Sequence, residues 1–221
     1  MALSRKVRGV IEGKSGVLAE NESREILKLY NISTPRYQVI REEEDLDEIK
    51  LRFPVALKVC STRILHKTDV GGVKLDIRDL DELRETYKDF KKRFPEEFFL
   101  VDEMMEKSVE AIVGLVQDPT FGLTIMVGIG GIFTELYKDV SFRIIPIERI
   151  DAVEMIEELK GKKIFEGFRN IRVSKEKLVE LLLKVSSMGE ELMDYIDQMD
   201  LNPVFLYEDS VCVVDAKIIL K

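Results

Sequence analysis

The order of apolar and polar residues along the chain predicts a mixture of strands and helices. Short apolar runs between turn residues are typical of β-strands, and they occur at 37–40, 55–60, 73–77, 98–102, 109–116, 123–127, 201–206 and 211–219. Apolar residues recur at helical spacing over 174–195 and over 79–94, which predicts two amphipathic helices. Two shorter helices are expected, one capped by residues 21–23 and ending near Tyr30, the other over the acidic segment 42–51.

Helices and strands alternate in the first half of the chain, whereas strands dominate its middle and end. This order indicates an α+β fold with a division near residues 95–100. We therefore expect a short N-terminal lead-in at residues 1–19, followed by two subdomains at 20–97 and 98–221.

Composition excludes several classes of protein. With 45% hydrophobic residues in a chain of 221, the sequence can bury a core and is not disordered. A net charge of −8 and a pI near 5.0 argue against general nucleic-acid binding. No stretch approaches the roughly 18 to 20 apolar residues of a membrane span, and the start of the chain lacks a signal-peptide core. Cys60 and Cys212 lie far apart in apolar runs, so we expect buried free thiols in a cytoplasmic protein.

One lysine interrupts an apolar strand. Lys58 lies between Leu57 and Val59 in the predicted strand 55–60. A buried ammonium is costly unless an anion pairs with it, so Lys58 is a candidate for binding an anion. Because strand side chains alternate between two faces, a position on the solvated face would fit the sequence equally well.

The next segment, 61–74, has the composition of an anion-binding loop. It combines hydroxyl groups, cations that include Lys67, and the pair Gly71–Gly72 between two predicted strands. Backbone amides freed by glycine, together with lysines, suit a polyphosphate. His66 is the only histidine of the chain, and its imidazole could titrate near neutrality or accept a phosphoryl group. A surface histidine without a role is the alternative.

The C-terminal segment predicts a pair of oxygen ligands. If the last two strands form a hairpin that turns on Glu208–Asp209, Asn202 lies directly opposite Asp215 on one face. An amide oxygen beside a carboxylate suits Mg²⁺, which takes few protein ligands and completes its shell with nucleotide phosphates. A one-residue change in loop length would move the two residues to opposite faces, and an ordinary turn beside an exposed aspartate is the alternative.

Three other charged residues are candidates for the same site. Glu103 ends a strand at the expected division, and Glu110 begins the next one. A cleft at such a junction is a common nucleotide site, although carboxylates at strand ends are ordinary. Arg143 lies in an apolar context, where its planar guanidinium could bind a phosphate or form a salt bridge with a carboxylate.

Taken together, five segments resemble one known family. They are VALKV at 55–59, LHKTDVGGVKL at 65–75, GIGGIFTELYKDVSFR at 128–143, DLNPVF at 200–205 and VVDAK at 213–217. Over nearly the whole chain, the sequence resembles the ATP-grasp β subunit of ADP-forming acetyl-CoA synthetases, a family of acyl-CoA synthetases related to succinyl-CoA synthetase. The resemblance implies an ATP-grasp fold of two α/β subdomains, with the nucleotide held between their sheets.

The resemblance also implies the reaction of an acid–thiol ligase, acyl-CoA + ADP + phosphate ⇌ acid + ATP + CoA, with acetyl-CoA as one acyl-CoA. In this family an acyl phosphate forms on an α subunit and phosphorylates a histidine there, and the phosphoryl group then passes to the nucleotide on the β subunit. We identify no CoA-binding domain in the sequence and expect a separate α subunit that carries it. The family implies an α2β2 heterotetramer, with ATP or ADP and Mg²⁺ as cofactors.

Residues of the loop and of the neighbouring strand acquire roles from this resemblance. His66 matches a β-subunit histidine proposed as a second phosphoryl carrier, and Lys58 matches a strand lysine that contacts nucleotide phosphate. A loop that swings would let one histidine reach two sites, and Gly71–Gly72 is a candidate hinge. Glu110 and Arg143 are carried over as nucleotide-binding and catalytic candidates.

The remaining matches concern the metal and the base. Asn202 and Asp215 match the ATP-grasp metal ligands. Glu103 and the adjoining backbone of Met104 and Met105 match the hinge region that meets adenine and ribose. Two alternatives stay open: another ATP-grasp ligase that couples an acyl phosphate directly to an amine, and a nucleotide-sensing regulatory module such as the ATP-grasp-like part of a protein acetyltransferase.

Overall fold

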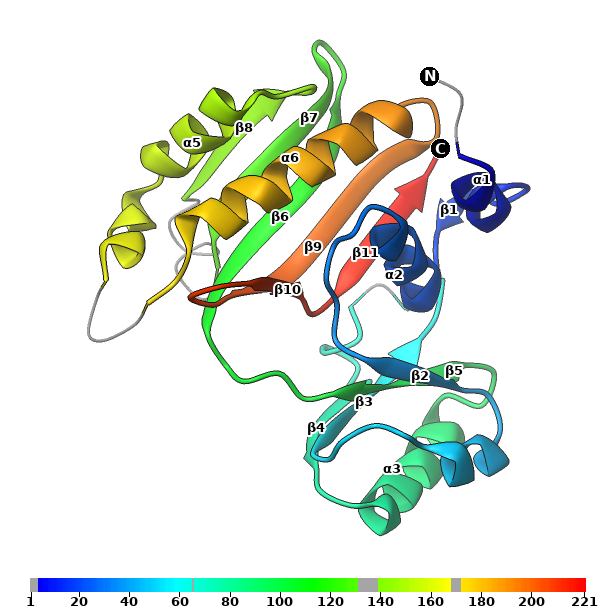
Figure 1. Ribbon diagram of the computed structural model, residues 1–221. Helices are drawn as coiled ribbons and strands as arrows, with labels where there is room; N and C mark the ends of the chain where they lie inside the picture. Colours follow the sequence, from blue (N-terminus) through cyan, green and yellow to red (C-terminus); the bar gives the residue numbers. More distant parts are fainter. Residues whose placement is uncertain (1–3, 65, 131–138, 168–171) are drawn as a thin grey trace. The chain divides into compact units, whose positions relative to one another are not determined.

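In the computed structural model, which describes residues 4–64, 66–130, 139–167 and 172–221, the strands assemble into two separate antiparallel sheets (Figure 1). Each sheet belongs to its own unit of the chain. The larger unit comprises residues 1–18, 22–34 and 107–221, and the smaller unit comprises 19–21 and 35–106. Among the described residues, no helix is long and apolar enough to cross a membrane.

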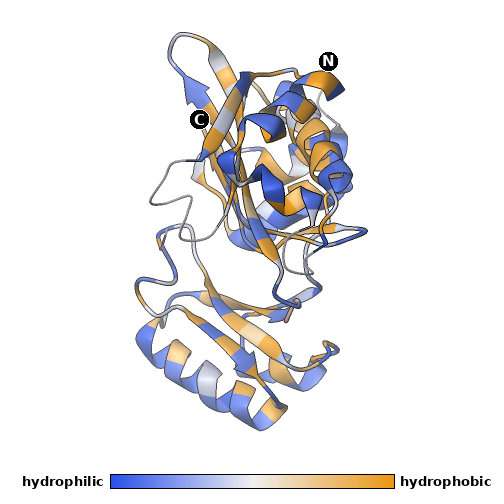
Figure 2. Ribbon diagram, turned by 90° about the vertical axis from the view of Figure 1, so that its left-hand side faces the viewer, coloured by the Kyte–Doolittle hydropathy of each residue, from blue (hydrophilic) through white to orange (hydrophobic). Residues whose placement is uncertain are grey.

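The smaller unit is a four-stranded sheet with one long helix. The strands follow the order β2 (Tyr37–Ile40), β5 (Phe98–Glu103), β3 (Val55–Cys60) and β4 (Val73–Ile77). Helix α3 (Leu80–Arg93) begins after Asp79, whose side chain accepts a hydrogen bond from the Glu82 backbone N–H. Its buried side chains pack on the alternate strand residues that include Leu57 and Phe99, while its charged side gives it the mostly hydrophilic colour seen in Figure 2. The opposite face of the sheet carries a second, small apolar cluster of Ala19, Cys60 and Leu100.

The larger unit is built on a seven-stranded sheet. Six strands follow the order β1 (Gly16–Val17), β11 (Ala216–Leu220), β9 (Ile196–Leu206), β6 (Val109–Asp118), β7 (Gly122–Ile129) and β8 (Val140–Ile144), and β10 (Val211–Val213) pairs with β9. Helices α5 (Arg149–Glu158) and α6 (Lys175–Glu191) contact the strands of this sheet. Alternate residues of β6, namely Ala111, Val113 and Leu115, are fully buried in the core with the apolar stripe of α6. The other face of β6 carries Glu110.

Segments from the start of the chain complete the larger core. Helix α1 (Arg5–Ile11) buries Val7, Val10 and Ile11, and α2 (Glu20–Leu29) buries Ile26 and Leu27 in the same cluster. The expected lead-in of 1–19 is therefore wrong, because most of it is an integral part of the larger unit. The expected boundary at 97/98 is also wrong: it would remove β5, which pairs with both β2 and β3, whereas the units divide after Glu106.

Several predicted elements differ in detail. Helix α2 begins at Glu20, so residues 21–23 lie inside it and do not cap it. The acidic segment 42–51 forms only a short 3₁₀-helix, η1 (Glu43–Glu48). The predicted strand 211–219 is divided into β10 and β11. Strand β8, helix α5 and a second 3₁₀-helix, η2 (Lys160–Glu166), are not predicted by the pattern.

Candidate functional site

The strand lysine is buried between two carboxylates. The Lys58 side chain is 6% exposed, and its Nζ lies 2.7 Å from Asp102 Oδ2 and 3.6 Å from Glu20 Oε1. Asp102 comes from the neighbouring strand, where it pairs with Ala56, two residues before Lys58. The solvated-face alternative is therefore wrong, and the cost of burying the ammonium is offset by two anions.

Glu20 connects this strand lysine to the loop. Its second oxygen, Oε2, accepts a hydrogen bond from Lys67 Nζ, and the Glu20 side chain is only 4% exposed. Two lysines and two carboxylates thus form one buried group of charges, all within the smaller unit. Burial raises the pKa of the neighbouring Cys60 thiol to about 12, which disfavours its reactive thiolate form.

The Lys67 loop is closed by its own backbone. The amide of Gly71 donates to the carbonyl of Thr68, and the amide of Gly72 donates to the carbonyl of Lys67. Both amides therefore already have carbonyl acceptors, and whether either one binds a phosphate stays a prediction. Gly71 has a φ of +63°, a left-handed conformation that favours glycine in a tight turn. The glycine at position 71 is therefore explained by this tight turn.

His66 stands immediately before this turn and is exposed. Its neighbour Leu65 lies outside the described residues, as do residues 131–138 of the segment 128–143 that contributed to the resemblance. An exposed imidazole next to an anchored lysine is accessible to a phosphorylated partner, which the proposed carrier role requires.

Glu103 ends β5 and is held in place by backbone and side-chain donors. Its Oε1 accepts a hydrogen bond from the Arg52 backbone N–H at 3.0 Å and lies 3.3 Å from Arg36 Nη1. The Met104 backbone N–H donates to the carbonyl of Pro54. A base bound along this segment would therefore have to exchange that bond before it could use the Met104 amide. For Met105 the structure gives only a half-buried position.

The larger unit places Asn202 opposite Asp215. The hairpin turns at Glu208–Asp209, with the Tyr207 backbone N–H donating to the carbonyl of Ser210. The Asn202 backbone N–H donates to the carbonyl of Asp215 at 3.2 Å. The predicted register is confirmed. Whether the two side chains bind a metal stays a prediction.

The surroundings of this pair fit a hard cation. Leu201 and Ala216, one position away, are a buried pair, whereas Asn202 is exposed and Asp215 half-buried, so the pair lies on the face away from the core. Glu110 alternates with buried Ala111 and is on this same face. Oxygen donors suit Mg²⁺. Within the described part of the chain, no cluster of three or more His, Cys, Asp and Glu side chains could hold a metal by itself.

Arg143 is not brought to this face. It pairs with the fully buried Ile125 in the β7–β8 ladder, so its side chain lies on the side covered by α5. There Nη2 is 2.5 Å from Glu158 Oε1, and Nη1 is 3.1 Å from Glu158 Oε2. The salt-bridge alternative describes Arg143 here, and within the larger unit it lies on the face of the sheet opposite to Asn202, Asp215 and Glu110.

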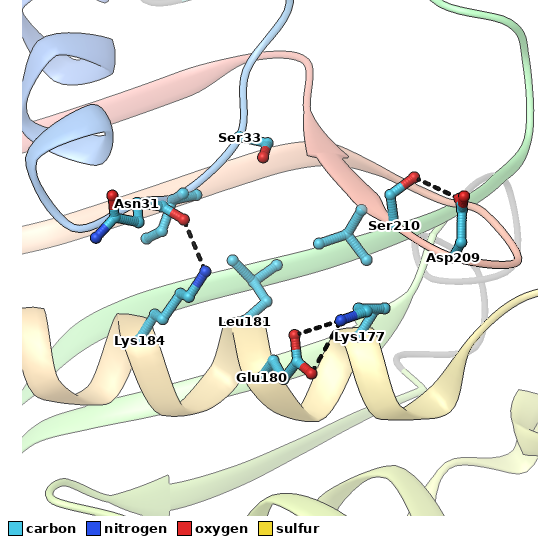
Figure 3. Close-up of a pocket in the computed structure, with 10 residues that line it drawn as sticks. Asn31, Ser33, Lys177, Glu180, Leu181, Lys184, Asp209 and Ser210 are labelled. Atoms are coloured by element: carbon cyan, nitrogen blue, oxygen red, sulfur yellow. Dashed lines mark hydrogen bonds and ion pairs between the residues drawn. The ribbon is translucent and has the colours of Figure 1, made fainter.

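A pocket of about 210 Å³ lies elsewhere on the larger unit, between α6 and the β9–β10 hairpin (Figure 3). Lys177 there pairs with Glu180, and Lys184 donates to the carbonyl of Asn31. None of the site residues predicted from the sequence lines this pocket.

Glu20 and Asp102 are the site residues that sequence reasoning missed. Asp102 follows the apolar run 98–101, so it is a charge inside a predicted strand in the same way as Lys58. Two opposite charges that interrupt neighbouring buried strands are a signal for a buried ion pair. Glu20 gives no comparable signal, because its partners are 38 or more positions away along the chain.

Comparison with known proteins identifies the fold. The family described as the ATP-grasp domain matches residues 9–220. The chain is 40% identical to the "Acetate--CoA ligase [ADP-forming] I subunit beta" of Pyrococcus furiosus, over 97% of this chain and 98% of that protein. The chain belongs to this ATP-grasp family of ADP-forming acetate–CoA ligase β subunits. The expected α+β ATP-grasp fold is thereby confirmed.

Other relatives place this β-subunit family in a wider context. The chain is 40% identical to part of the "Acetate--CoA ligase [ADP-forming] II" of Archaeoglobus fulgidus, over 92% of this chain but only 30% of that protein. A solved acetyl-coenzyme A synthetase of Ca. Korarchaeum cryptofilum, 38% identical, matches with a TM-score of 0.84 over 97% of this chain and 100% of its own. That structure contains coenzyme A and Mg-AMPPCP, and its phosphohistidine segment points towards the nucleotide-binding site.

Proposed function

We propose that this chain is the nucleotide-binding β subunit of an ADP-forming acyl-CoA synthetase. With an α subunit it would reversibly convert acyl-CoA, ADP and phosphate into acid, ATP and CoA, with acetyl-CoA as the first substrate to test. The single observation that carries this proposal is the match to a β subunit across 98% of that subunit's length.

The two units would contribute different groups to nucleotide binding. Lys58 and Lys67, which are already adjacent to each other around Glu20, would neutralise phosphate charge. Glu103 and the backbone of Met104 and Met105 would meet the adenine and ribose.

The larger unit would contribute the metal ligands. Asn202 and Asp215 would hold Mg²⁺, and Glu110 on the same face would assist nucleotide binding. Phosphoryl transfer needs mainly positioning and charge neutralisation. The metal, when bound, neutralises charge on the transferring phosphate.

His66 would carry the phosphoryl group. An imidazole nitrogen of His66 attacks the phosphorus of the partner's phosphohistidine, so that a new N–P bond forms while the partner's N–P bond breaks. A β-phosphate oxygen of ADP then attacks the same phosphorus. The N–P bond on His66 breaks, the terminal P–O bond of ATP forms, and the imidazole is regenerated.

The partner would be an α subunit that binds CoA and forms the acyl phosphate. Single-chain relatives in which this domain is about 30% of the length are consistent with a large CoA-binding remainder. We propose a heterotetramer of two α and two β subunits.

The decisive experiment is reconstitution. The chain is purified with its α subunit from the native source, and ATP formation is measured from acetyl-CoA, ADP, phosphate and Mg²⁺. The complex should make ATP, and His66→Ala should abolish it. Arg63→Gln is the matched control, because Arg63 lies in the same loop and its side chain remains 63% exposed in its ion pairs with Glu96 and Glu97.

Different failures have different meanings. If the wild-type complex makes no ATP but joins an acid to an amine, the chain belongs to another kind of ligase. If the His66→Ala complex turns over at the wild-type rate, the synthetase assignment stands and the carrier role is wrong.

A further inference from the structure

The Glu20 carboxylate is a fixed part of the smaller unit. Ala19, on one side of it, packs with Cys60 and Leu100. Asn21, on the other side, accepts hydrogen bonds from the Tyr37 hydroxyl at its carbonyl and from the Cys60 thiol at its side chain. The carboxylate between them is therefore attached at both sides to the same sheet as Lys58.

The two lysines depend on Glu20 to different degrees. Lys58 has Asp102 at 2.7 Å and Glu20 only at 3.6 Å, so the neighbouring strand would keep it in place without Glu20. Lys67 stands on a loop and donates to Glu20 Oε2. A rigid carboxylate thus holds a loop cation at a fixed position beside a strand cation.

The same contact also fixes the backbone next to His66. The turn after Lys67 is closed by the hydrogen bond from the Gly72 amide to the Lys67 carbonyl, and the Gly72 carbonyl accepts from Val59 of β3. Lys67 is therefore fixed through both its backbone and its side chain. His66, which precedes it, has its C-terminal end tied to the sheet through Glu20 and β3.

We propose that Glu20 is a positioning residue for phosphoryl transfer, which holds Lys67, and through it His66, in register with Lys58. The inference rests on the proposed function. Glu20 does not touch the phosphoryl group, and it acts through Lys67. Because Lys58 keeps its Asp102 partner, loss of Glu20 should impair the transfer step more than nucleotide binding.

The test measures kcat and the KM for ADP in the reconstituted αβ complex. Glu20→Gln keeps the size and polarity of the side chain but removes its charge. We expect kcat to fall by about tenfold or more, as for other small misplacements of a reacting group, with the KM for ADP within about twofold of wild type. Glu22→Gln is the control, since Glu22 lies two residues further along α2 and pairs with Lys14.

A double-mutant cycle separates positioning from a general loss of structure. Lys67→Gln alone should lower kcat, and the combination of E20Q and K67Q should be no slower than K67Q, because both remove the same pair. If the two losses multiply, or if E20Q raises the KM for ADP and leaves kcat unchanged, the proposal is wrong.

Two further outcomes are distinguishable. A wild-type complex without activity would overturn the proposed function itself, whereas an active wild type with an equally active E20Q overturns only the positioning role. If E20Q does not fold, Glu20→Asp, which keeps the charge, is compared by the same cycle. Because Glu20 acts through Lys67, Glu20→Asp should lower kcat more when Lys67 is present than in the K67Q background, and equal losses in the two backgrounds would contradict the proposal.

Discussion

At the scale of the residue, Lys58 is a buried charge held between two carboxylates. Replacing Lys58 with methionine would leave Glu20 and Asp102 buried with one fewer counterion. We expect the free energy of unfolding to fall by about 3 to 5 kcal/mol, as for other buried ion pairs that lose one partner. Urea denaturation of the isolated chain measures it.

A matched variant calibrates this loss. Lys14→Met removes a cation that pairs with Glu22 at 2.8 Å, but both side chains are substantially exposed, so it should cost at most about 1 kcal/mol. Equal effects of the two substitutions would mean that the Lys58 group of charges is hydrated and not buried.

The role of Arg143 is open to a pH test. Hydrogen bonds from Arg143 and Ser141 lower the pKa of Glu158 from its ordinary 4.5 to about 2. A carboxylate whose pKa is lowered by folding stabilises the protein above its unfolded pKa, and this contribution disappears as the pH falls through the folded pKa. The stability difference between wild type and Glu158→Gln should therefore be constant above about pH 5 and vanish near pH 2. Because Glu158 is half exposed, this difference in the free energy of unfolding should not exceed about 1 kcal/mol.

The reference for that comparison is urea denaturation at each pH, with Glu176→Gln as a control for an exposed arginine pair on another helix. A difference that persists at pH 2 would mean that Glu158 stabilises by packing and not by its ion pair with Arg143.

Residue-scale predictions succeeded where a single strand or hairpin determines the answer. The register of Asn202 against Asp215 follows from one turn, and Lys58 is visible as a charge in an apolar run. The partners Glu20 and Asp102 were missed because pairing between distant segments is set by the assembled sheet. Gly71 and Gly72 give an ambiguous signal, since the need for a tight turn and the need for a phosphate site select the same residues.

At the scale of the element, the end of the β6–β7 pair depends on one glycine. A Cβ on Gly130 would lie 2.8 Å from Glu110 Cβ and 2.9 Å from the Glu110 backbone. Backbone atoms in a paired strand cannot give way easily, so Gly130→Ala should destabilise the larger unit by about 1 to 3 kcal/mol. Thermal unfolding of the isolated chain measures it.

A glycine-to-alanine substitution in α1 should have the opposite effect on stability. Gly9 lies inside that helix with no atom within 4 Å of its would-be Cβ, so Gly9→Ala should stabilise by up to about 1 kcal/mol through helix propensity. If both variants shift the melting temperature in the same direction, the close approach of Gly130 to Glu110 does not explain the effect of Gly130→Ala.

Elements with a strong period were predicted well, and short ones were not. Helix α6 buries a long apolar stripe, and α3 has a clear polar and apolar side, so both follow from sequence. Helix α5 exposes the apolar residue Ile150 to solvent, so the apolar residues in its sequence do not mark one buried face clearly. The segment 42–51 buries only Leu46 within its short helix, and so little apolar surface does not sustain a longer one.

At the scale of the whole molecule, the chain folds back on itself in a way that local patterns do not report. Strand β1 near the N-terminus pairs with β11 near the C-terminus. Strands β2 and β5 also pair, although almost the whole sequence of the smaller unit separates them. Each is a long-range pairing. A division drawn from the order of helices and strands along the chain therefore misses both boundaries, because neither pairing is visible in that order.

Separate cores predict separate local unfolding. Ile11 in α1 is buried in the core of the larger unit, and Leu83 in α3 is buried in the core of the smaller one. Truncating either side chain to alanine should cost about 2 to 5 kcal/mol. Amide hydrogen exchange should locate that cost: Ile11→Ala should accelerate exchange in β11 and β9 and leave β3 and β5 unchanged, while Leu83→Ala should do the reverse. Each variant is the control for the other. If both variants accelerate exchange throughout the chain, the two units unfold together. Destabilising either unit would then also disrupt the ion pairs of Glu20.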